Sequence, residues 1–286
     1  MLVELVQTQS AEGLRLDGAL RTPVSGAPCQ MTCDSAILLS GVGSNFYGSS
    51  LMRQLTEMLV DSGVAALCAN TRGHDGVNTA STAGGGRLQG AAYEIVDDCR
   101  HDVTAWADFL VERGFSHIAL IGHSLGAIKS LYSQAHQRHE QVGRVVAISP
   151  PRLSHDAFRH GPQSAAFFES ISTAQQMADR GESNMLFQAK FPVPIVVSAA
   201  TYLDKYGPPS RYDILQFAPR VVCPVLFVYG GDELENGGIA FAGLPKAIAE
   251  LSWSSPPPIE IIPEANHFYA GRFDELSTIL RSSLST

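Results

Sequence analysis

The strongest chemical signal in the chain is a run of five residues, Gly122-His123-Ser124-Leu125-Gly126. The run follows the apolar stretch HIALI directly and opens a helical pattern, so Ser124 is predicted to lie on a sharp strand-to-helix turn. The flanking glycines remove the Cβ atoms that would clash in such a turn. The turn exposes the hydroxyl and aims the amide groups of the helix N-terminus at a reacting carbonyl. Ser124 is therefore the candidate nucleophile.

A serine hydroxyl needs a neighbouring general base, and the chain contains nine histidines. His267 follows the last predicted strand, Ile259–Ile262, and this position places it at the same sheet edge as Ser124. His123 lies inside the turn and is expected to point elsewhere. His74, in the loop after the second parallel strand, is the competitor. We predict His267 as the base.

A carboxylate should hold the imidazole of the base in its working tautomer. The segment Gly230-Gly231-Asp232-Glu233 follows an apolar strand and gives the chain order serine, acid, histidine. Asp is the commoner residue in this role, whereas a turn of the form Gly-x-x-acid selects Glu233. Both Asp232 and Glu233 remain candidates, with Glu233 preferred.

Two backbone N–H groups should bind the oxyanion that forms during acyl transfer. One is predicted to come from Leu125, the residue after the nucleophile. The other is assigned to Val42, in the glycine-rich turn SGVGSNF that follows the first parallel strand. The alternative for this turn is an ordinary connection between a strand and a helix.

The elements that must position these residues alternate along the chain. Continuous apolar runs followed by amphipathic segments predict a mainly parallel sheet with helices on both faces. An opening hairpin, Leu2–Gln7 and Leu14–Leu20, is expected to add antiparallel strands at one edge. The remaining predicted strands are Ala36–Leu39, Val64–Ala69, Ile118–Ile121, Val145–Ile148, Val221–Tyr229 and Ile259–Ile262.

The regular alternation stops between Pro150 and Arg220. This segment is rich in Phe and Tyr, and segments of such length in a compact domain are usually lids or binding elements. We expect a lid whose aromatic side chains line a pocket. The alternative is that they form a small core within the segment itself.

Together, the strand–GHSLG–helix, the SGVGSNFYGS turn, the NTRGHDG turn at Asn70–Gly76 and the NHFYAGR segment resemble the α/β-hydrolase superfamily, and in particular its serine esterases. The resemblance covers nearly the whole chain. It implies an α/β fold with a mostly parallel eight-stranded sheet flanked by helices and a helical cap inserted after the sixth strand. The core would comprise residues 1–150 and 220–286, and the cap residues 151–219.

The resemblance also maps the family's nucleophile onto Ser124, its base onto His267 and its acid onto Asp232 or Glu233. Many members have His-Gly at the oxyanion turn where this chain has Ser40-Gly41, so the side-chain support of the turn must differ. The expected reaction is hydrolysis of a carboxylic ester or thioester of a small, neutral to apolar substrate through an acyl-enzyme. Alternatives are a C–C bond or lactone hydrolase, and a ligand-binding module with negligible turnover.

Composition narrows the partners. Twenty Lys and Arg stand against 28 Asp and Glu, a formal charge of −8, and no basic cluster occurs, so neither nucleic acid nor a membrane surface is expected as a partner. No metal or cofactor motif is found, so none is expected. The N-terminus does not resemble a signal peptide, and five cysteines without recurrent spacing are expected to be reduced, which favours the cytoplasm. The oligomeric state is not encoded in any pattern that we can identify.

Overall fold

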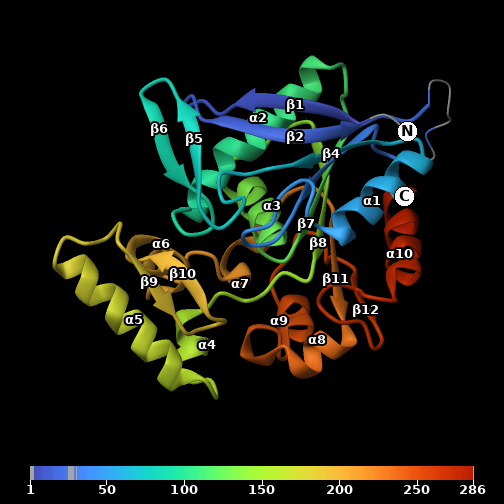
Figure 1. Cartoon of the computed structure of the whole chain (residues 1–286). Helices are drawn as coiled ribbons and strands as arrows, with labels where there is room; N and C mark the ends of the chain where they lie inside the picture. The colour runs from blue at the N-terminus through green and yellow to red at the C-terminus, as the bar shows by residue number, and fades with distance from the viewer. Residues whose placement is uncertain (1–2, 25–28, 30, 286) are drawn as a thin grey trace.

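An eight-stranded sheet occupies the centre of the computed structural model, which describes residues 3–24, 29 and 31–285 (Figure 1). Its strands are β1 (Glu4–Gln9), β2 (Arg15–Arg21), β3 (Ser35–Leu39), β4 (Ala65–Ala69), β7 (Ile118–His123), β8 (Val142–Ile148), β11 (Val225–Gly230) and β12 (Ile259–Ile262). Their order in the sheet is β1-β2-β4-β3-β7-β8-β11-β12. Leu2, which we expected in the first strand, lies outside the described residues.

Strand direction confirms the expected pattern. Six strands that are neighbours in the sheet pair in parallel, namely β4, β3, β7, β8, β11 and β12. β1 and β2 form an antiparallel hairpin, and β2 pairs antiparallel with β4. Every residue of β3, β4, β7 and β11 is buried, which explains their continuous apolar sequences. Because parallel strands end at one edge, the loops that follow them meet there.

Helices cover both faces of this sheet (Figure 1). On one face α1 (Ser50–Asp61) and α10 (Phe273–Ser285) bury Leu55, Leu59 and Leu280 against the sheet. On the other, α2 (Cys99–Glu112), preceded by the 3₁₀ turn Val96–Asp98, and α3 (Leu125–His136) bury Trp106 and Leu131. Two hydrophobic cores thus sandwich the sheet and hold its strand ends in fixed positions.

The segment between β8 and β11 lies outside the main sheet, beside α3 (Figure 1). It contains α4 (His155–Arg159), α5 (Ser164–Asp179), β9 (Leu186–Ala189), β10 (Ile195–Ser198), α6 (Ala199–Tyr206), α7 (Ile214–Phe217) and the 3₁₀ turn Ala218–Arg220. β9 and β10 form an antiparallel pair. The segment therefore contains a strand pair as well as helices, whereas we expected a helical cap.

Most aromatic side chains of this segment are buried in hydrophobic clusters. Phe158, Phe167 and Phe191 are at most 2% exposed and contact one another edge to face, with ring centroids 4.8–5.7 Å apart. Tyr202 is fully buried as well, whereas Phe168 is 47% exposed. Burial therefore argues against an aromatic pocket lining, and Phe158, Phe167 and Phe191 belong to the same hydrophobic core as α2 and α3.

Two further regions differ from the sequence prediction. β5 (Asn78–Thr82) and β6 (Gly85–Gln89) form a separate hairpin between β4 and α2, and their polar, largely exposed residues show no apolar periodicity. After β11 come α8 (Gly231–Asn236), the 3₁₀ turn Gly238–Ala240 and α9 (Leu244–Ala249). None of the described helices is long and apolar enough to cross a membrane.

Candidate active site

The loops that follow five parallel strands hold the candidate residues at one sheet edge. Gly41 follows β3, Ser124 follows β7 and Ser149 follows β8. Glu233 lies in α8 directly after β11, and His267 lies in the loop after β12. Residues separated by more than 200 positions in the sequence are thereby brought to one site.

Ser124 occupies the sharp turn that its sequence predicts. Its φ is 57° and its ψ −124°, a conformation that costs free energy for a residue with a Cβ, and it joins the last residue of β7 to the first of α3. A Cβ on Gly122 would overlap the carbonyl oxygen of Gly126, and one on Gly126 would overlap that of Leu39. The two glycines are required by this close packing.

His267 forms a hydrogen bond with Glu233, the pairing expected of a base and its orienting acid. The distance from His267 Nδ1 to Glu233 Oε2 is 2.5 Å, and Glu233 is only 4% exposed. The carboxylate of Asp232 is exposed and accepts a hydrogen bond from Asn236 Nδ2 at 2.7 Å. Of the two acids that the sequence left open, the geometry favours Glu233, because Asp232 faces solvent.

His123 positions the main chain of the base. Its Nε2 lies 2.7 Å from the carbonyl oxygen of His267, which can only accept, so Nε2 carries the proton. The two imidazole rings lie 4.7 Å apart. Burial, with a smaller contribution from His267, lowers the pKa of His123 to about 3. His123 thus donates to the main chain of His267, and it remains a neutral donor at ordinary pH.

The ring of His267 therefore lies against the residue that precedes Ser124. Within the described chain, neither Ser124 Oγ nor His267 Nε2 makes a hydrogen bond. Ser124 is half-buried, and the side chain of His267 is 29% exposed. Both side chains are thus partly accessible to solvent.

The turn after β3 approaches the nucleophile closely. A Cβ on Gly41 would lie 3.2 Å from Ser124 Cβ and 3.5 Å from its Oγ. The neighbouring Val42 is 46% exposed, and Leu125 is the first residue of α3. Neither of these two residues donates its amide N–H to an acceptor in the described chain. The two amides are available as donors beside Ser124.

Asn45 and Asp75 support this turn. Asn45 Nδ2 donates to Asp75 Oδ1 at 2.6 Å, and Asn45 Oδ1 accepts from the Gly48 amide at 2.7 Å. His74, the competing base, lies 2.8 Å through its Nδ1 from the other oxygen of the Asp75 carboxylate. His74 therefore belongs to the loop support and is not paired with Glu233.

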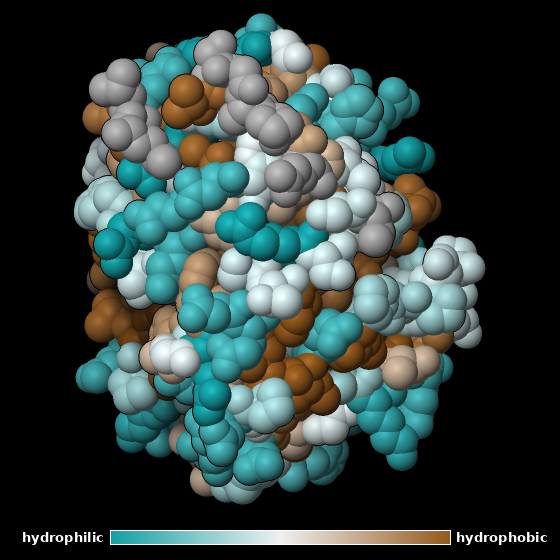
Figure 2. Space-filling view, turned by 90° about the vertical axis from the view of Figure 1, so that its right-hand side faces the viewer, coloured by the Kyte–Doolittle hydropathy of each residue, from teal (hydrophilic) through white to brown (hydrophobic). Residues whose placement is uncertain are grey.

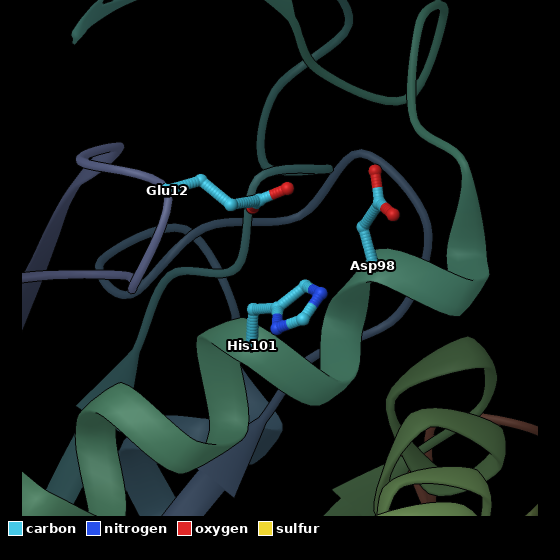
Figure 3. A group of neighbouring side chains, drawn as sticks. All are labelled: Glu12, Asp98 and His101. Atoms are coloured by element: carbon cyan, nitrogen blue, oxygen red, sulfur yellow. The ribbon is translucent and has the colours of Figure 1, made fainter. Parts of the chain in front are cut away.

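A cluster elsewhere contains metal-ligating residue types. Glu12, from the β1–β2 turn, and Asp98 and His101, at the start of α2, point toward one another (Figure 3). The buried guanidinium of Arg72 forms ion pairs with Glu12 at 2.7 Å and with Asp98 at 2.9 Å. Arg72 also pairs with the fully buried Asp102 at 2.8 Å, so its guanidinium contacts three carboxylates and the cluster is explained as part of an ion-pair network.

A cavity of about 600 Å³ lies between β12 and α10, lined in part by Ile261, Arg272 and Ile279. It lies on the side of the molecule that carries α10, where apolar and hydrophilic side chains alternate in patches (Figure 2). None of the candidate catalytic residues lines it. The candidate active site therefore lies at the sheet edge and does not include this cavity.

Two residues of the site, Ser149 and Tyr269, were not predicted from the sequence. Ser149 Oγ donates to Glu233 Oε1 at 2.6 Å, and the hydroxyl of Tyr269 lies 2.8 Å from Ser149 Oγ. Ser149 belongs to no motif, whereas Tyr269 lies in the NHFYAGR segment, where no role was predicted for it. The available signal was position, since Ser149 follows β8 at the edge where Ser124 follows β7.

Comparison with known proteins agrees with this fold. The sequence profile described as the Alpha/beta hydrolase family matches residues 36–276. No curated protein matches the sequence.

Several solved structures share the fold at low sequence identity. The alpha/beta hydrolase GrgF from Penicillium sp. sh18 is 15% identical, with a TM-score of 0.69 over 99% of this chain and 97% of that chain. A soluble variant of monoglyceride lipase from Saccharomyces cerevisiae, in complex with a substrate analog, is 14% identical, with a TM-score of 0.67 over 99% and 96%. Est1E from Butyrivibrio proteoclasticus with bound ferulic acid is 16% identical, with a TM-score of 0.65 over 97% of each chain.

Proposed function

Since this chain belongs to the alpha/beta hydrolase family, we propose that it is a serine hydrolase that cleaves carboxylic esters through an acyl-enzyme intermediate. Ser124 is the nucleophile, His267 the general base and Glu233 the acid that orients it. The observation that carries the proposal is the hydrogen bond between His267 and Glu233, formed where His267 lies against the residue next to Ser124.

The geometry supports a two-step reaction. His267 Nε2 accepts the Ser124 proton as Oγ attacks the carbonyl carbon, and Glu233 stabilises the imidazolium that forms. The amides of Val42 and Leu125 donate to the oxyanion, at the N-terminus of α3. His267 then protonates the leaving alcohol or thiol. In the second step it activates a water molecule that hydrolyses the acyl-enzyme.

The surroundings of His267 favour small, neutral to apolar substrates. The rings of Phe241 and Phe268 lie 5.6 and 5.1 Å from its ring, and Phe268 is 65% exposed. Val42, beside the nucleophile turn, is also exposed. Such apolar surface attracts an acyl or alcohol group by roughly 0.8 kcal/mol per buried methylene. Two structural neighbours, Est1E with bound ferulic acid and a monoglyceride lipase with a bound substrate analog, support the same class of substrate.

We also propose that residues 151–219 form a cap over this core. Three contacts tie the segment to it. Lys205 in α6 forms an ion pair with the buried Glu94 at 3.4 Å, the amide of Ser198 donates to the carbonyl of Ala92, and the amide of Arg152 donates to Ala240. A cap held in this way selects substrates mainly by restricting access.

The proposal is tested with p-nitrophenyl esters of increasing acyl length and with an alkyl thioester. The parent protein should turn these substrates over, and Ser124→Ala should lower kcat by about 10⁴-fold or more while folding is retained. Labelling by a fluorophosphonate without turnover would instead indicate a ligand-binding module.

A further inference from the structure

Three hydrogen bonds join four side chains in a chain behind the proposed base. His267 Nδ1 lies 2.5 Å from Glu233 Oε2, Ser149 Oγ lies 2.6 Å from Glu233 Oε1, and Tyr269 Oη lies 2.8 Å from Ser149 Oγ. Tyr269 belongs to the same loop as His267. The loop is thus linked to Glu233 twice, directly through residue 267 and indirectly through residue 269.

The direction of each hydrogen bond follows from the chemistry of the groups. An ionised carboxylate only accepts, so Ser149 donates its one proton to Glu233. Ser149 Oγ is then left to accept from Tyr269, whose single hydroxyl proton is shared with the Val228 carbonyl at 3.2 Å. Burial and the neighbouring Glu233 charge raise the pKa of Tyr269, so its hydroxyl stays protonated.

The orientation of the Glu233 carboxylate is set by what its two oxygens bind. Oε1 accepts from Ser149 and, at 3.2 Å, from the Gly230 amide, which leaves Oε2 for His267. Ser149 is fully buried and Tyr269 is 1% exposed, so water does not compete for these bonds. Hydrogen bonds to an ionised group are about twice as strong as neutral ones.

The backbone carries strain at the same place. Six described non-glycine residues have positive φ, and three of them are Ser124 (57°), Ser149 (49°) and Tyr269 (55°). Glycine would adopt φ near 49° without the steric cost that serine has there. The backbone conformation at this position therefore does not explain why a serine is present. The hydroxyl of Ser149, which contacts Glu233, does.

We propose that Ser149 is a positioning residue of the hydrolase site, which holds the Glu233 carboxylate against His267, and that Tyr269 fixes the direction of its hydroxyl. The inference rests on the proposed function for its kinetic consequences. The chain of hydrogen bonds itself can be tested independently of turnover.

The decisive variants are Ser149→Ala and Ser149→Gly. Both remove the hydroxyl, and the glycine variant also removes the backbone strain, so a purely conformational role predicts that Ser149→Gly is as active as the parent. We expect both to lower kcat about ten- to a hundredfold, the range that corresponds to one hydrogen bond to a charged group, with KM changed less than about twofold.

Ser210 offers a matched control. It is a serine with a φ of 47°, it is 7% exposed and its hydroxyl accepts from the His155 amide at 2.9 Å, but it makes no contact with Glu233, His267 or Ser124. Ser210→Ala and Ser210→Gly should leave kcat unchanged within about twofold. A loss at both serines would assign the effect to general destabilisation and overturn the proposal.

Two further measurements separate this inference from the proposed function. The Nδ1 proton of His267, observed by NMR, should move or broaden in both Ser149 variants and stay in place in both Ser210 variants. Tyr269→Phe should lower kcat in the same direction, and the Tyr269→Phe/Ser149→Ala pair should lose less than the product of the two single effects. Absence of ester turnover in the parent defeats the proposed function alone. Parent-like kcat and an unmoved resonance in Ser149→Gly defeat the positioning role alone.

Discussion

Replacing Glu233 by Gln tests the orienting acid with almost no change of shape. The parent carboxylate presents Oε1 to two donors, Ser149 Oγ and the Gly230 amide, and Oε2 to His267 Nδ1. In the Glu233→Gln variant the amide oxygen must take the Oε1 position, because only an oxygen can accept both of those bonds. The NH₂ group then faces His267.

This exchange reverses the tautomer of the base. With a donor opposite Nδ1, the neutral imidazole must accept there and carry its proton on Nε2, where it cannot accept the Ser124 proton. The variant also removes the negative charge that stabilises the imidazolium. We expect kcat to fall by about 10³- to 10⁴-fold, which corresponds to roughly 4–5.5 kcal/mol of transition-state stabilisation.

Asp232→Asn is the matched control, since it makes the same chemical change one residue earlier, on an exposed carboxylate that accepts from Asn236. It should retain kcat within about twofold, as exposed substitutions away from special features usually do. The assay is steady-state hydrolysis of a p-nitrophenyl ester, together with the thermal midpoint of each variant. A severe Asp232→Asn and a mild Glu233→Gln would refute the assignment of the acid.

Three further predictions concern stability and the turn beside the nucleophile. Folding lowers the pKa of His123 to about 3, so this residue should reduce the unfolding free energy by about 1.4 kcal/mol per pH unit as the pH falls from about 6.5 toward 3. In urea titrations at several pH values, His123→Gln should make the unfolding free energy depend less steeply on pH. An equally steep dependence would refute this prediction. Gly41→Ala adds a Cβ 3.2 Å from Ser124 Cβ, so fluorophosphonate labelling should slow at least tenfold with the thermal midpoint kept, whereas unchanged labelling would separate this turn from the site. Phe167→Ala and Phe191→Ala should each cost about 3–5 kcal/mol of unfolding free energy while the acyl-chain preference stays that of the parent, and a changed preference would return these rings to the substrate pocket.

The sequence predicted those parts of the site that depend on local chain geometry. The Gly122–Gly126 turn is specified by glycines that only a tight strand-to-helix connection requires. His267 followed from its place after the last strand, because parallel strands end at one edge. The parallel direction of most strands was also predicted, since buried parallel strands have continuous apolar sequences.

The sequence could not resolve what depends on the rotation of single side chains. Asp232 and Glu233 are adjacent, and only the start of α8 decides which of them turns inward. Ser149 lies in no motif, so its contact with Glu233 becomes visible only when β8 and β11 pair. The β5–β6 hairpin was missed because its polar strands bury too little surface to show a period of two.

Aromatic content alone also failed to distinguish a pocket from a core. Phe158, Phe167 and Phe191 face one another, which depends on how α4 and α5 pack and not on composition. The aromatic rings near the proposed base are those of the exposed Phe268 and the partly buried Phe241, and both residues lie outside the aromatic-rich segment.

The central claim is that Ser124 becomes acylated during turnover. Rapid acid quenching of the parent protein with a p-nitrophenyl ester, followed by peptide mass mapping, measures this directly. The account predicts one acyl adduct, on the peptide that contains Ser124, and no adduct in Ser124→Ala, whose turnover should be lost. An adduct on another residue, or continued turnover by a clean Ser124→Ala preparation, would contradict it.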